Sequence, residues 1–231
     1  MYLYTVYYYS SKKALLVSHI GGKTMRKMKK VFALLLIIAM SAMMLVGCGE
    51  PKTTPEESAK IFLDVLLKND KTDIDKIGMN EEGYTEFRKV LEEGMMEGFS
   101  NTGVDNSILT DEVKNAFKDS MLTGLTKLEY EVVSSSEDKN IAKVEVKIKG
   151  FDMNKISAES QKKLQAEFTK NPAMTQAEMF QSSFKHVGEG IAAGIIVPEP
   201  NSINLTLTKE NNIWLPGEND IIALMTVIVA R

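Results

Sequence analysis

The sequence predicts an α+β fold in which N-terminal helices pack on a curved antiparallel β-sheet, with a helical insertion between two hairpins. Apolar residues recur with a helical period of about 3.6 from residue 55 to residue 125. The period changes to 2 over residues 128–148 and again over residues 203–215, and it is helical between these two regions. Each β region has one polar face, which is typical of antiparallel sheets.

The only cysteine of the 231 residues closes an apolar run, in the stretch Leu45-Val46-Gly47-Cys48. Leu45 and Val46 suit an apolar peptidase subsite, Gly47 leaves the scissile carbonyl unobstructed, and a cysteine thiolate is readily alkylated. This stretch resembles the lipobox of bacterial lipoproteins. The resemblance implies that Cys48 is lipidated on sulfur and becomes the new N-terminus. The alternative is an ordinary buried cysteine.

The residues before the lipobox have the composition of a secretory signal, and we assign residues 25–47 to a lipoprotein signal peptide. A basic stretch is followed by an apolar run of sixteen residues, 31–46, interrupted only by Ser41. As a helix this run would reach about 24 Å, short of the ~30 Å hydrocarbon core of a bilayer. An uncleaved anchor helix is the alternative. In both cases the basic side stays in the cytoplasm and the chain from Cys48 onward lies outside.

Residues 1–24 have five tyrosines among the first nine residues and no acidic residue. The stretch Gly21-Gly22-Lys23-Thr24 can be encoded by GGA GGT AAA ACA, which places a ribosome-binding GGAGG just before the codon of Met25. We therefore expect translation to begin at Met25 and residues 1–24 to be a mis-annotated extension. The alternative is a genuine but disordered extension.

Removal of residues 1–47 leaves an acidic protein of 184 residues. It takes away seven of the 28 Lys and Arg and none of the 31 Asp and Glu, so the formal charge becomes 21 minus 31, or −10. This balance argues against nucleic-acid binding and against electrostatic adhesion to anionic lipid. Lipid on Cys48 would then hold the protein at the outer face of the cell membrane.

The remaining chain is expected to be a short tether, residues 48–54, and a single extracytoplasmic domain, residues 55–231. Thr54 is the expected N-cap of the first helix, with Glu57 closing a capping box. We expect that helix to end at Asn69-Asp70, and further helices at residues 73–77, 81–99 and after Thr110. Gly94, Gly98 and Gly103 indicate a loop or a close crossing of backbones.

The first hairpin is expected to have its turn at residues 134–140, with inward side chains that include Ile141. The insertion is expected to be two helices, residues 157–169 and 175–193. The glycines of residues 188–194 superficially resemble a phosphate loop, but they close a helix, so we expect them to permit close packing. His186 has no partner histidine after residue 47, and we expect a hydrogen-bonded or solvated role for it.

The second β region is expected to have its turn at residues 209–212, and it ends in Ile213-Trp214-Leu215 followed by Pro216-Gly217. This pattern resembles the last hairpin of Gram-positive lipoproteins with a nuclear transport factor 2-like, or cystatin-like, domain. The resemblance implies helices on a curved antiparallel sheet, and the helical insertion departs from a minimal member. Residues 220–230 are expected to form a helix capped by Asn219-Asp220, with a β-strand as the alternative.

Two classes of function are open. The first is a non-catalytic binding or interaction module of the cell envelope, whose partner is an envelope protein or a small apolar or peptide ligand. The alternative is an envelope enzyme with a site formed by dispersed carboxylates. We expect no catalytic residue, metal or cofactor, because the chain has no histidine pair after residue 47 and no known catalytic motif. Trp214 is the candidate ligand-binding residue, or else it plugs the end of the core.

Overall fold

The structure is a computed structural model that describes residues 52–229 except 101–104 and 106. The predictions for residues 1–51, including the start at Met25, the signal peptide and the lipobox, therefore lie outside the described residues. The elements are α2 (Pro55–Leu63), η1 (a π-helix, Asp64–Lys68), η2 (a 3-10 helix, Ile74–Ile77), α3 (Glu81–Ser100), α4 (Asp111–Leu125), β1 (Glu129–Asp138), β2 (Ile141–Lys149), α5 (Met153–Lys170), α6 (Gln176–Ala192), β3 (Asn201–Glu210), β4 (Ile213–Pro216) and α7 (Glu218–Ile228).

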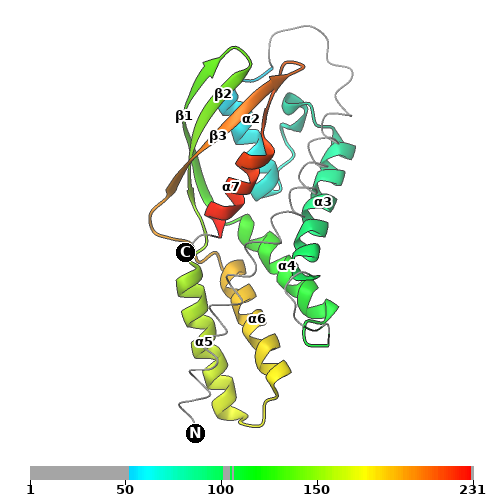
Figure 1. The fold of residues 1–231 in the computed structure, drawn as a ribbon, viewed down its shortest axis with the longest axis vertical. Coiled ribbons are helices and arrows are strands. Elements are labelled where there is room, and N and C mark those ends of the chain that lie inside the picture. The colour runs from blue at the N-terminus through cyan, green and yellow to red at the C-terminus, as the bar shows by residue number, and fades with distance from the viewer. Residues whose placement is uncertain (1–51, 101–104, 106, 230–231) are drawn as a thin grey trace.

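The four strands form one antiparallel sheet in the order β1-β2-β3-β4. The chain leaves the sheet after β2, forms the α5–α6 hairpin, and returns as β3 directly beside β2. Figure 1 shows this hairpin below the sheet. The predicted α+β class, with a helical insertion between two hairpins, is confirmed.

Helices α2 and α7 pack on the buried face of the sheet. Both elements and the strands contribute fully buried side chains to a single hydrophobic cluster, whereas the opposite face of β2 is more exposed. Helix α3 adds Phe87, whose ring meets that of Phe62 edge to face at a centroid distance of 6.4 Å. The core thus lies between the sheet and the helices that precede and follow it.

The turn of the first hairpin is shorter than predicted. Strand β1 runs to Asp138, and only Lys139 and Asn140 connect it to β2. Serines and acids are typical of turns, but they are also tolerated on an exposed edge strand, which explains the error. The inward residues are Ala142, Val144, Val146 and Ile148, so the prediction that Ile141 points inward was wrong: its side chain is 52% exposed.

The second hairpin also has a two-residue turn, Asn211-Asn212, with φ angles of 51° and 62°. Two successive positive φ angles are typical of the tight turns whose twist matches that of paired strands, and asparagine tolerates this conformation. Lys209 and Glu210, predicted to be in the turn, belong to β3.

The predicted helix starts are confirmed at four positions, where Thr54, Asn80, Thr110 and Thr175 each accept a hydrogen bond from a backbone N–H of the first turn. The capping box predicted at Glu57 was wrong, because that carboxylate pairs with Lys76 at 3.1 Å.

Two helices of the second half begin earlier than predicted. Helix α5 begins at Met153, capped by Asp152, which accepts a hydrogen bond from the Lys155 N–H. The tail is a helix, as favoured, but it begins at Glu218 with Gly217 as N-cap. Asp220, expected in the cap, instead accepts a hydrogen bond from the Thr206 N–H at 2.9 Å.

Small residues bring α6 close to both of its neighbours, as predicted. A Cβ added at Gly190 would lie 2.9 Å from the Ile156 side chain of α5, and one added at Gly124 of α4 would lie 2.5 Å from the Ile191 carbonyl oxygen. At Gly98 no atom would lie within 4 Å, which excludes, at that position, the close backbone crossing that was one of the two alternatives.

We predict that Gly124→Ala and Gly98→Ala have opposite effects on stability. The first forces a backbone apart and should cost about 1–3 kcal/mol in the free energy of unfolding. The second should stabilise the protein by about 0.5–1 kcal/mol, because alanine replaces glycine inside a helix with free space around it. Urea unfolding of the two variants measures both. An unchanged midpoint for Gly124→Ala would contradict the close packing of α4 on α6.

Candidate functional site

The two hairpin turns lie at one end of the sheet. We call these turns, with the adjoining residues Glu137, Lys209 and Trp214, the turn end of the sheet. The Trp214 side chain is 1% exposed and belongs to the hydrophobic cluster. Lys209, its cross-strand partner, places its Nζ 4.9 Å from the centroid of the indole ring. The same Nζ lies 3.6 Å from Oε1 of Glu137. A cation–π contact and an ion pair therefore cover the indole.

This burial is expected if the Trp214 side chain plugs the end of the core, which we call the plug interpretation. A ligand could reach the buried indole only if side chains around it, including that of Lys209, moved aside. The ligand-binding role of Trp214 therefore stays a hypothesis.

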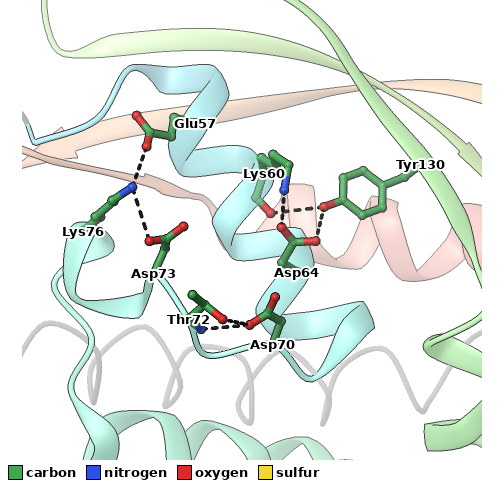
Figure 2. A network of polar contacts seen from close by, with 8 residues as sticks. All are labelled: Glu57, Lys60, Asp64, Asp70, Thr72, Asp73, Lys76 and Tyr130. Carbon is green, nitrogen blue, oxygen red and sulfur yellow. Dashed lines mark hydrogen bonds and ion pairs between the residues drawn. The ribbon is translucent and has the colours of Figure 1, made fainter.

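A second polar cluster joins α2 to β1 (Figure 2). The Tyr130 hydroxyl donates a hydrogen bond to the Asp64 carboxylate, which also pairs with Lys60 at 2.6 Å. Burial, reinforced by the Asp64 carboxylate, raises the pKa of the Tyr130 hydroxyl far above its ordinary value. Tyr130 therefore acts as a neutral hydrogen-bond donor that fixes β1 to the helix, and it is not suited to act as a base.

The rest of this cluster ties the segment after α2 back onto that helix (Figure 2). Lys76 lies between Glu57 and Asp73, at 3.1 and 3.3 Å, and the hydrogen bond to Glu57 raises the pKa of its ammonium group. Asp70 accepts hydrogen bonds from the backbone and hydroxyl of Thr72, which lower the pKa of its carboxyl. These side chains are largely in solvent, so each pair contributes little stability.

A third polar cluster joins α5 to α6 around His186, which is 7% exposed. Its Nε2 lies 3.0 Å from Oε1 of Glu167 on α5, and its Nδ1 lies 3.1 Å from Oε2 of Glu189 on α6. Ser182 donates to the Glu167 carboxylate, and Lys163 lies 2.8 Å from Glu189. The predicted hydrogen-bonded role of His186 is confirmed.

This arrangement leaves little scope for catalysis at His186. Both ring nitrogens already face a carboxylate, so neither is directed toward a substrate. The carboxyl pKa values of both glutamates are lowered, mainly by Ser182 at Glu167 and by Lys163 at Glu189. Within the described part of the chain, no group of three or more His, Cys, Asp or Glu is arranged to hold a metal ion.

Sequence reasoning missed the glutamates that contact His186. Glu189 follows His186 by three residues on one helix, and this spacing was a usable signal. Glu167 lies on the other helix, and nothing local in the sequence connects it to His186. Leu45, Val46, Gly47 and Cys48, the predicted lipidation and peptidase-recognition residues, lie outside the described residues. Across the described residues, no helix has both the length and the apolar character needed to span a membrane.

The fold and its clusters define an α+β domain whose buried polar groups hold helices to the sheet and to each other. The chain belongs to the family described as Domain of unknown function (DUF5105), which matches residues 45–227. No curated protein sequence matches the chain.

The fold is similar to that in a crystal structure of a protein from Bacillus subtilis described as a "putative lipoprotein (ycdA)". The TM-score is 0.65 at 18% sequence identity, and the similarity covers 78% of this chain and 57% of that chain. This chain thus spans little more than half the length of that protein.

We predict that Trp214→Ala costs about 3–5 kcal/mol in the free energy of unfolding, because it leaves a cavity under the Lys209–Glu137 pair. Ile141→Ala is the matched control on an exposed side chain and should change stability by less than about 1 kcal/mol. Urea melts measure both losses. A loss below about 1 kcal/mol for Trp214→Ala would exclude the plug interpretation.

We predict that the α5–α6 cluster loses stability in acid. The carboxyl pKa values of Glu167 and Glu189 are lower in the folded chain than their unfolded values of about 4.3. Their contribution is therefore present above about pH 4.3 and is lost as the pH falls through the folded values. Ser182→Ala removes the main cause of the lowered pKa at Glu167 and should make the loss of stability below about pH 4.3 shallower. If the free energy of unfolding fell with the same slope against pH in the unsubstituted protein and in Ser182→Ala, the result would contradict a stabilising role of the Ser182–Glu167 contact.

Proposed function

We propose that the protein is a membrane-anchored extracytoplasmic lipoprotein of a Gram-positive cell envelope, attached through lipid on Cys48. The observation behind the proposal is the sequence Leu45-Val46-Gly47-Cys48 at the end of an apolar run, a few residues before a folded domain begins. Lipid chains would provide the membrane affinity, which the acidic chain itself cannot supply.

Two comparisons support this proposal. The family match begins at residue 45, so the lipobox residues are part of the region shared with the family. The Bacillus subtilis protein of similar fold is itself described as a "putative lipoprotein". The N-terminal basic and apolar residues complete the pattern of a signal peptide.

We further propose that the domain is a non-catalytic binding or interaction module. The absence of catalytic motifs from the sequence supports this, as do the paired nitrogens of His186 and the neutral hydroxyl of Tyr130. Its partner would be an envelope protein or a small apolar or peptide ligand. A screen of the purified domain against metals and hydrolase substrates tests this, and turnover of any substrate would contradict it.

We also propose a relationship to nuclear transport factor 2-like lipoprotein domains. An N-terminal helix on the buried face of an antiparallel sheet, with the tryptophan in the last hairpin, supports it. The α5–α6 insertion is the main departure from that layout.

We predict that Cys48→Ser leaves the protein unlipidated and no longer in the membrane fraction, while the domain still folds, because the core of the domain is formed by residues from Ala59 onward. Incorporation of labelled palmitate and partitioning into the detergent phase measure the anchor, and circular dichroism checks the fold. Label that persisted in the serine variant would place the anchor elsewhere.

A further inference from the structure

Within the described residues, the N-terminal segment packs against the rest of the domain from Thr53 onward. The side chain of Thr53 is 6% exposed, and its Oγ1 lies 2.5 Å from Oγ of Ser58. Thr54 caps α2, and Pro55 at the first helical position is buried. Thr53 and Thr54, which were predicted to belong to the tether, are thus part of the packed domain.

This fixed point lies beside the turn end of the sheet. Ser135, three residues before the end of β1, donates a hydrogen bond to the carboxylate of Glu56 in the first turn of α2. Figure 1 shows α2 beginning at the end of the sheet where the hairpins turn, with α5 and α6 extending from the opposite end. The chain therefore enters the domain at its turn end.

The distance from a lipid on Cys48 to this point is limited by chain length. Four residues lie between Cys48 and Thr53, so the connection has five residue-to-residue steps. An extended chain spans at most about 3.6 Å per step, or about 18 Å in total. This limit holds for any conformation of the intervening residues. It is shorter than the sheet, because the nine residues of β2 alone extend over about 30 Å.

We propose that the turn end of the sheet faces the lipid surface and that the α5–α6 hairpin points away from it. The inference rests on the lipid anchor proposed above. Residues 139–141 and 211–212 then lie at the headgroups, while the turn between α5 and α6 is the most distant part of the domain.

The side chains at the turn end suit a light contact with headgroups. Lys139, Asn140 and Asn211 are exposed and polar, and Ile141 beside them is a large apolar residue that is 52% exposed. The acidic residues Glu137 and Asp138 offset the lysine, so charge would not draw this end to anionic lipid. The lipid anchor holds the domain, and the short chain determines which end meets the membrane.

The opposite end is far enough away to be distinguished by experiment. Helix α5 has 18 residues, about 27 Å at 1.5 Å per residue, and it continues from the far end of β2. Together with the length of β2, this places the α5–α6 turn roughly 50 Å from the hairpin turns.

The test uses the full lipidated protein in phosphatidylglycerol–phosphatidylcholine vesicles that contain a rhodamine-labelled lipid as energy acceptor. One donor fluorophore is attached to Asn140→Cys at the turn end or to Ala173→Cys in the α5–α6 turn, both at exposed positions. Glu210→Cys is a second turn-end variant, in case the first does not fold. Lipidated Cys48 has no free thiol, so each variant takes a single label.

We expect energy transfer to the vesicle surface to be several-fold more efficient from Asn140→Cys and Glu210→Cys than from Ala173→Cys. Equal transfer from both ends, or stronger transfer from Ala173→Cys, would overturn the proposed orientation. Flotation of the vesicles tests the anchor separately. Protein that does not float with the vesicles would overturn the anchor, and the orientation with it, whereas floating protein with reversed transfer overturns the orientation alone.

Discussion

The fold depends on the burial of α2 against the sheet. The apolar side of α2 meets the alternating inward residues of the strands, and the side chains at this contact are almost completely removed from water. Burial of each valine, leucine, isoleucine or phenylalanine side chain at this contact contributes about 1.5–3 kcal/mol, so the contact outweighs any single polar interaction in the domain. The residues concerned are Ala59, Phe62 and Leu63 of α2, Leu66 of the adjoining η1, and Ala142, Val144, Val146 and Ile148 of β2.

The polar clusters give this packing its orientation. Tyr130 and Asp64 join the edge strand β1 to the side of α2, and Ser135 holds the first turn of the helix. His186 and Glu167 do the same between α5 and α6. Because α2 is held along its length, the chain enters the domain at one defined place. With lipid on Cys48, the short connection to that place would determine which end of the domain faces the membrane.

The sequence was sufficient to predict the α+β class, most of the helix caps and the order of the elements, because these follow from local period and capping chemistry. The prediction that Ile141 points inward was wrong, because register depends on the partner strand. Both turns were predicted to be too long, because turn-forming residues such as Ser134 also occur on exposed strands. The pairs Tyr130–Asp64 and His186–Glu167 were not predictable, because each joins residues that only the fold brings together.

The central claim is that α2 and the sheet form one cooperative unit. Native-state hydrogen exchange read by mass spectrometry tests it directly, by comparing backbone amides of residues 59–66 in α2 and η1 with those of residues 142–148 in β2. We expect both sets to exchange with the same opening free energy, equal to that of global unfolding. Exchange of the α2 amides through a local opening, while the β2 amides stay protected, would contradict the account.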